Sequence, residues 1–318
     1  MLYAPAPLHI PDGFLSLVIS LIFWGLTIIM VSIAISKTNK TLGEKQVPLM
    51  GIMAAFIFAA QMLNFPVAGG TSGHFLGGAL AAIVLGPWAG ILVMTAVIAL
   101  QALLFQDGGL LVMGANIFNM GLLTAMIGFG LYRGVAGRKK STRLAVAGLA
   151  AWLAVVASAL ITALQLWLSG TTRLEIVVPA MLGVHVLIGI GEGIITVAAL
   201  SFIEQTRPDL VNEKETASKG GRGWIYAGVV ISLLAVLLSP FASANPDGLE
   251  RVAEDIGFLS QGQEAPFQIL PDYTIPFLGE TALSTVVAGA VGALVLLGLM
   301  ILLGSLLRRD KKKAHPHQ

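Results

Sequence analysis

The sequence contains no cysteine and little charge. The absence of cysteine among 318 residues excludes disulfide bonds, thiolate metal ligands and thiol nucleophiles. Charged residues make up only 11% of the chain and hydrophobic residues 56%, and the mean hydropathy is +0.86. Soluble domains contain about 25% charged residues. This composition therefore predicts an integral membrane protein.

The chain also lacks the sequence patterns of several enzyme classes. It has no Gly-x-x-x-x-Gly-Lys-Ser/Thr loop, so we expect it not to hydrolyse ATP through a Walker motif. It has no His-Glu-x-x-His pattern, which would indicate a zinc protease. No basic region precedes the first apolar run, so no cleavable signal peptide is indicated. We predict that the chain is not an enzyme.

Long apolar runs predict an all-α polytopic helix bundle. Eight runs have the length of a membrane-spanning helix. They cover residues 14–36, 46–65, 88–105, 110–132, 144–168, 177–204, 223–243 and 282–307. A shorter run, 74–86, would extend only about 20 Å as a helix, so we expect it to face protein rather than lipid. The fold prediction is about seven membrane segments before the polar stretch 207–222 and two after it.

The basic residues predict the topology. If 74–86 counts as a separate crossing, every lysine and arginine except Arg173 and Arg251 lies on one side of the membrane. Positive residues gather on the cytoplasmic side of membrane proteins. We therefore predict a multi-pass protein of the cell (inner) membrane, with its N-terminus outside and its C-terminus in the cytoplasm.

A charged linker divides the chain into two modules. The predicted domains are a first membrane module at 1–206, a cytoplasmic linker at 207–222, and a second module at 223–318. The second module has two helices that flank an outer loop, which carries seven carboxylates against the single Arg251. This acidic loop is either merely solvated or concentrates a cation at the outer face.

Two histidines are predicted on the outer side. His9 lies in "LHIPDGF", just before the first apolar run, and His74 ends the loop "NFPVAGGTSGH". Imidazole nitrogen suits nickel, cobalt, copper and zinc, whereas magnesium and calcium prefer oxygen ligands. The His9 amide and the nitrogen of Leu8 could complete a planar set of nitrogens, and the Pro-Asp-Gly turn would present His9 to His74. The alternative is that both histidines are interfacial packing residues.

Other polar residues near or within the predicted helices are candidates for supporting roles. They are Asn64, Thr71 and Ser72 of the loop before His74, Asn116 and Asn119 of "GANIFNMG", and His185 and Glu192 of "GVHVLIGIGEGIIT". The asparagines suit interhelical hydrogen bonds. His185 and Glu192 share a helix face, which predicts a packed polar pair or a contact that couples helices. Ala55 and Ala59 form a small-residue face, which either packs within the protein or docks a second membrane subunit.

Four segments resemble the CbiM/NikM family. They are "HIPDGF", "GGTSGHFLGGALAAIVLGPWAG", "GANIFNMG" and "HVLIGIGEG", which occur in the family's order over residues 8–206. The family comprises the substrate-binding membrane components of energy-coupling factor transporters for cobalt and nickel. Residues 223–318, with "NPDGLERVAED", resemble the two-helix PDGLE (NikN-like) component, here fused to the first.

The resemblance implies a specific metal site. In the family the ion lies near the outer surface in a square-planar set of nitrogens, which carries over to His9, His74 and the backbone or terminal nitrogen of Leu8. The family's histidine is the second residue of the mature chain, whereas here "MLYAPAP" and Leu8 precede His9. Our hypothesis is that Leu8 is an initiator codon read as Met, or that the first seven residues are removed.

The resemblance also implies a function and partners. We expect a substrate-specificity subunit of an ATP-driven importer for Ni²⁺ or Co²⁺, with no resident cofactor and no nucleic-acid partner. A transmembrane coupling component and cytoplasmic ATPase components would be its partners, with Ala55 and Ala59 at the docking face. The alternatives are a self-sufficient secondary metal carrier and an intramembrane enzyme that uses His185 and Glu192.

Overall fold

Apolar helices make up most of the computed structural model, which describes residues 9–208 and 223–314. Seven described helical segments are long and apolar enough to cross a membrane. They are α1 (Leu17–Thr41), α4 with η1 (Pro87–Leu100, Gln101–Phe105), α5–η2–α6 (Met113–Asn116, Ile117–Leu123, Thr124–Arg133), α7 (Lys140–Leu168), α8 (Leu174–Thr206), α9 with η4 (Gly223–Leu238, Ser239–Phe241) and α11 (Ala282–Ala314). The predicted helical membrane fold is confirmed.

Two further apolar helices are shorter than the predicted spans. α2 (Gln46–Gln61) ends before the predicted limit of 65, and α3 (Gly78–Leu85) replaces the predicted helix 74–86. The reason is a hairpin in which β1 (Phe65–Val67) pairs antiparallel with β2 (Thr71–Gly73). Gly77, with φ of 84°, then lets the chain turn into α3. The prediction that this segment faces protein is confirmed, because every residue of α3 is buried.

Small residues allow the helices around α3 to approach closely. A Cβ atom at Gly128 of α6 would lie 2.6 Å from the Cα of Ala79, and one at Gly90 of α4 would lie 2.8 Å from the Cα of Ala82. Helices in lipid associate through such packing, because lipid tails are as apolar as their side chains. The short helix is therefore the centre of the first module.

The two C-terminal helices pack mainly on α2. A Cβ atom at Gly51 of α2 would lie 2.8 Å from the carbonyl oxygen of Leu297 in α11, and one at Gly228 of α9 would lie 2.5 Å from Ile52. The chain itself buries Ala55 and Ala59, which are 3% and 0% exposed. This arrangement favours the packing interpretation of the small-residue face, since no surface of the two alanines is open to a partner.

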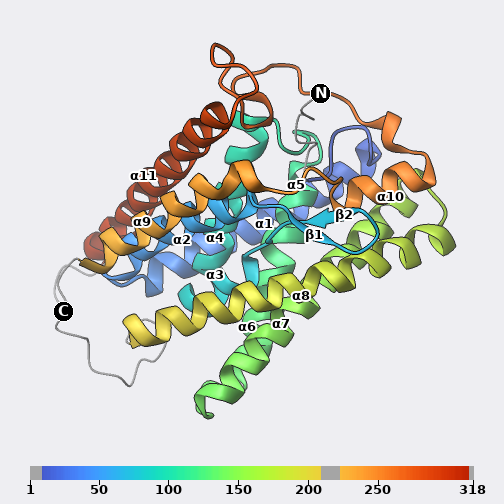
Figure 1. Ribbon diagram of the computed structural model, residues 1–318. Coiled ribbons are helices and arrows are strands. Elements are labelled where there is room, and N and C mark those ends of the chain that lie inside the picture. Colours follow the sequence, from blue (N-terminus) through green and yellow to red (C-terminus); the bar gives the residue numbers. More distant parts are fainter. Residues whose placement is uncertain (1–8, 209–222, 315–318) are drawn as a thin grey trace.

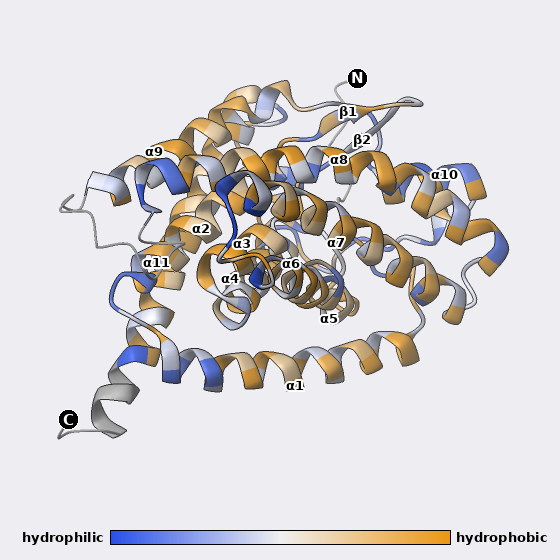
Figure 2. Ribbon diagram, turned by 90° about the horizontal axis from the view of Figure 1, so that it is seen from below, coloured by the Kyte–Doolittle hydropathy of each residue, from blue (hydrophilic) through white to orange (hydrophobic). Residues whose placement is uncertain are grey.

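The distribution of hydropathy fits a membrane bundle. Figure 2 shows hydrophobic residues along the helices and hydrophilic residues at helix ends and connections. α1 exposes apolar side chains such as Leu17, Val18 and Ile29, which in a bilayer contact lipid. At one end of the bundle, β2 lies beside α10 (Gly248–Ile256), an amphipathic helix of the C-terminal module (Figure 1). We name this the site end.

Candidate metal site

The segment that carries His9 is fixed to the bundle by the carboxylate of Asp12. Its Oδ2 accepts the backbone N–H of Leu110 (3.0 Å), and its Oδ1 accepts those of Leu111 (2.9 Å) and Val112 (3.2 Å). These N–H groups precede α5 and would otherwise have no helical partner. Gly109 makes room for the contact, since a Cβ there would lie 2.2 Å from the Asp12 nitrogen. The Pro-Asp-Gly turn thus anchors the segment that carries His9.

Asn116 holds the residue next to His9. Its Oδ1 accepts the backbone N–H of Ile10 (3.1 Å), and its Nδ2 donates to the Ile10 carbonyl (3.0 Å). The N–H of Gly109 donates to the same carbonyl at 2.9 Å. Asn116 therefore positions the segment that carries His9 rather than bridging two helices. Asn119 does bridge helices, because its Nδ2 donates to Thr162 (3.1 Å) and Gln165 (2.7 Å) of α7.

His9 contacts the turn after η1. Its Nδ1 lies 3.1 Å from the carbonyl oxygen of Asp107 and 3.4 Å from the Asp107 carboxylate. Gly108, with φ of 97°, permits this approach, because a Cβ there would lie 2.9 Å from the Cβ of His9. His9 is only 2% exposed. Burial lowers the pKa of His9 below its ordinary value, and the charge of Asp107 offsets this only in part.

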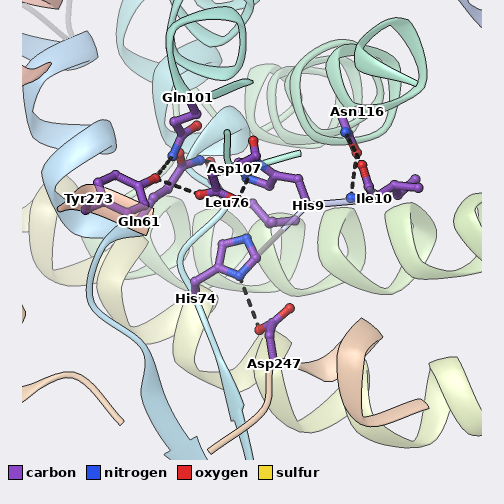
Figure 3. A network of polar contacts seen from close by, with 10 residues as sticks. All are labelled: His9, Ile10, Gln61, His74, Leu76, Gln101, Asp107, Asn116, Asp247 and Tyr273. Carbon is purple, nitrogen blue, oxygen red and sulfur yellow. Dashed lines mark hydrogen bonds and ion pairs between the residues drawn. The ribbon is translucent and has the colours of Figure 1, made fainter. Parts of the chain in front are cut away.

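His74 contacts a carboxylate of the C-terminal module. Its Nδ1 lies 3.2 Å from Oδ1 of Asp247, which directly precedes α10 (Figure 3). Burial disfavours the charged ring, but the charge and hydrogen bond of Asp247 outweigh it, so the pKa of His74 lies above its ordinary value. Burial likewise opposes ionisation of Asp247, yet His74 and His185 hold the pKa of this carboxyl below its usual range.

The backbone around Asp247 is bonded to β2. The N–H of Ser72 donates to the Pro246 carbonyl at 2.8 Å, and its hydroxyl donates to the Asn245 carbonyl at 2.8 Å. The Asn64 carbonyl accepts the N–H of Ser243 at 2.8 Å, while its side-chain Oδ1 has no hydrogen-bond partner among the described residues. Thr71 is buried and pairs with Val67 in the hairpin. These loop residues thus attach the hairpin to the C-terminal module.

The two histidine rings lie edge to face beside a small cavity. Their centroids are 5.6 Å apart at an interplanar angle of 74°. Both Nε2 atoms are buried and have no hydrogen-bond partner within the described part of the chain. The cavity measures about 50 Å³, and its lining includes His9, His74, His185 and Asp247. Rings whose Nδ1 contacts an oxygen while Nε2 stays open have the arrangement of metal-ligating histidines.

His185 and Glu192 do not form the expected polar pair. His185 donates from Nδ1 to the Met181 carbonyl one helical turn away (2.7 Å). Glu192 accepts the backbone N–H groups of Leu76 (2.6 Å) and Gly77 (2.9 Å), just ahead of α3. The positive end of a helix favours a carboxylate at this position. Glu192 therefore couples α8 to the backbone two and three residues after His74.

Sequence reasoning missed three residues that contact or support the histidines. Asp107 and Tyr273 were not singled out as site residues, and Asp247 was one of seven carboxylates in the acidic loop. The Tyr273 hydroxyl donates to Asp107 Oδ2 at 2.6 Å. Burial, and then the charge of Asp107, raise the pKa of Tyr273 well above its ordinary value, so this hydroxyl stays protonated. The one sequence signal among the three is the Pro-Asp-Gly pattern at Asp247, because an aspartate before a helix is typical of a helix start.

The donor set differs from the planar set that the resemblance implies. A chelate that combines the amide and ring of His9 uses Nδ1, because Nε2 cannot reach its own backbone, yet here Nδ1 faces Asp107. Within residues 9–208 and 223–314, no group of three or more His, Cys, Asp or Glu side chains could hold a metal ion. Additional nitrogen ligands would come from the backbone or from Leu8, which lies outside the described residues.

A larger cavity lies away from the histidines. It has a volume of about 720 Å³ and is enclosed by α2, α8 and α9. Its lining is almost entirely apolar, so it offers no set of nitrogen or oxygen donors for an ion.

Comparison with known protein families assigns most of the chain. Residues 9–210 match the family described as the cobalt uptake substrate-specific transmembrane region. This chain belongs to that cobalt-uptake family. The rest of the chain also matches a known unit, because residues 222–309 match the PDGLE domain.

Relatives of this cobalt-uptake family member share one or both parts. A protein of Archaeoglobus fulgidus, named for fused nickel transport (NikMN), is 38% identical and aligns over 92% of this chain and 96% of its own length. The cobalt transport protein CbiM of Geobacter sulfurreducens is 31% identical over 77% of this chain and 74% of its own. A crystal structure of a transition metal transporter is 33% identical, has a TM-score of 0.56, and covers 62% of this chain and 92% of its own.

Proposed function

We propose that this chain is the substrate-specificity subunit of an ATP-driven energy-coupling factor importer for Ni²⁺ or Co²⁺. The observation that carries the proposal is the pair of buried imidazole rings of His9 and His74, which line one small cavity and whose Nε2 atoms have no hydrogen-bond partner among the described residues. The relatives that are named for nickel and cobalt transport support the identity of the ion.

The chemistry of the donors supports a late transition metal as the substrate. Two neutral imidazoles with additional backbone nitrogen favour nickel or cobalt over magnesium or calcium, which require oxygen ligands. The carboxylates of Asp107 and Asp247 contact the Nδ1 atoms of His9 and His74 and not their Nε2 atoms. In this position they offset the charge of the ion and leave the imidazoles as its ligands.

The site end would face the outside of the cell. Basic residues mark the opposite end, where Arg143 pairs with Glu204 at 2.8 Å and Lys140 lies 4.0 Å from the same carboxylate. Positive residues favour the cytoplasmic side. An ion captured between His9 and His74 would then enter from outside and leave toward the cytoplasm.

Transport would require separate subunits. The sequence has no Walker loop, so ATP hydrolysis belongs to cytoplasmic ATPase components, which a transmembrane coupling component would connect to this chain. Ala55 and Ala59 of α2 are buried, so they are not accessible to a coupling component. This component would dock on another, lipid-facing surface, or on α2 after α11 has moved away from it.

Uptake of radioactive ⁶³Ni²⁺ and ⁵⁷Co²⁺ into proteoliposomes tests this function. The chain would be reconstituted with the coupling and ATPase components of its host, and in parallel with an ATPase variant that cannot hydrolyse ATP. ATP-dependent uptake that His74→Ala abolishes supports the proposal. Uptake at an equal rate by the chain alone would instead establish a secondary carrier.

A further inference from the structure

We propose that Asp247, a residue of the C-terminal module, is a positioning residue that fixes the tautomer of His74 so that Nε2 presents its lone pair to the ion. This inference rests on the proposed function for the identity of the ion. It gives the C-terminal module a defined chemical role at the metal site, the control of the His74 tautomer.

The hydrogen bonds determine which ring nitrogen carries the proton. A carboxylate only accepts hydrogen bonds, so the Nδ1 of His74, 3.2 Å from Asp247 Oδ1, must donate. A neutral imidazole has one N–H, and its other nitrogen then carries the lone pair. The open Nε2 atom of His74 is therefore the one that can bind a metal.

Asp247 is itself held in place on two sides. It is 4% exposed, and it immediately follows the Asn245–Pro246 segment that is hydrogen-bonded to Ser72 of β2. Its backbone carbonyl accepts the N–H of Arg251 in the first turn of α10 (2.8 Å). The carboxylate is consequently oriented by the fold, as the residue behind a metal-bound histidine needs to be.

The same module also reaches the other histidine. Tyr273 donates to Asp107 Oδ2 at 2.6 Å and accepts from Gln101 Nε2 at 3.2 Å, and its ring stacks on Phe105 with centroids 4.6 Å apart. Asp107 in turn lies against the Nδ1 of His9. In addition, the N–H of Gln263 donates to the Asp12 carbonyl at 2.8 Å. The loop 242–281 thus supports both halves of the site (Figure 3).

Nitrogen-15 NMR of metal-free, histidine-labelled protein tests the tautomer directly. The chain has five histidines, so the His74 signals can be assigned by their absence from the His74→Ala spectrum. At an alkaline pH, where the ring is neutral, we expect Nδ1 to be protonated and Nε2 to be unprotonated. A His74 that carries its proton on Nε2 in the wild type would overturn the proposal without any further variant.

Nickel affinity of purified full-length variants gives the second measurement. We expect Asp247→Ala to weaken nickel binding by about 10- to 100-fold, the usual effect of losing the hydrogen-bond partner behind a metal-bound histidine. In this variant the proton of neutral His74 should no longer be confined to Nδ1. Asp247→Asn, whose amide oxygen can still accept, should lie between Asp247→Ala and the wild type. Glu254→Gln is the matched control, since it removes an exposed charge from α10, the helix that Asp247 precedes, and should change neither the affinity nor the tautomer.

Failure of the positioning role is distinguishable from failure of the proposed function. If His74→Ala abolishes nickel binding while both Asp247 variants keep wild-type affinity and tautomer, Asp247 has no positioning role and the function stands. If the wild type binds neither Ni²⁺ nor Co²⁺, the proposed function fails, and the NMR spectrum still decides the tautomer.

Discussion

The anchoring of the His9 segment by Asp12 leads to a quantitative prediction for Asp12→Ala. The substitution removes the acceptor of three backbone N–H groups ahead of α5, one of them fully buried. A bond to a charged group contributes about 1.5–3 kcal/mol, and the loss of a helix cap costs about 1 kcal/mol. Because such contributions are not additive and two of the groups are only partly buried, we expect the free energy of unfolding to fall by about 2–4 kcal/mol.

The same substitution should weaken nickel binding, because the anchored segment carries His9. Bonds from Asn116 and Gly109 to Ile10 remain, so the segment would be loosened rather than released. At about 1.4 kcal/mol per tenfold change in affinity, the transmission of about half of this loss to the site corresponds to a weakening of about tenfold. Asp12→Asn, which keeps one acceptor oxygen, should show a smaller effect in both measurements.

Thermal unfolding in detergent and isothermal titration with Ni²⁺ measure the two effects. Asp255→Ala is the control, because this carboxylate is exposed in α10 and pairs with Arg251 on the same helix. Wild-type stability and affinity in Asp12→Ala would refute the reasoning, since three backbone donors would then have lost their acceptor without consequence.

Three other predictions follow from the same geometry. Glu192→Ala leaves the N–H groups of Leu76 and Gly77 without their acceptor, so the unfolding free energy should fall by about 2–5 kcal/mol, as measured by thermal unfolding. Gly108→Val should weaken nickel binding as measured by titration, because the valine side chain would collide with His9 and a φ of 97° disfavours a branched residue. Wild-type affinity in this variant would contradict the prediction. Burial raises the pKa of Glu250 to about 7 in the folded protein. Between about pH 4.5 and 7 the side chain ionises more readily in the unfolded chain, so wild-type stability falls as pH rises through this range. Glu250→Gln should therefore gain stability relative to the wild type over that range, and a constant difference across pH would exclude the effect.

The sequence predicts the helical membrane fold well, because apolar length and the distribution of charge are local properties of a chain. The β1–β2 hairpin was missed, since each strand has only three residues and both lie in the short connection between two expected helices. Topology alone placed His9 and His74 on one side, and the structure brings their rings to 5.6 Å. Their role as metal ligands remains a prediction.

The residues behind the histidines could not be found by the same reasoning. Asp247 lies 173 residues from His74 in the sequence, and Tyr273 lies 166 residues from Asp107. No periodicity or spacing links positions so far apart, and the acidic loop contains other carboxylates of identical chemistry. The fold selects Asp247 among them because its neighbour Pro246 is hydrogen-bonded to β2.

The most direct test of the central claim is the metal content of purified protein after equal exposure to Ni²⁺ and Co²⁺. Wild type would be compared with His9→Ala and His74→Ala, with His317→Ala as the control that removes a histidine from the C-terminal tail. The account predicts about one ion per chain in wild type and control, with loss in both site variants. Equal metal content in all four proteins would contradict a site between His9 and His74.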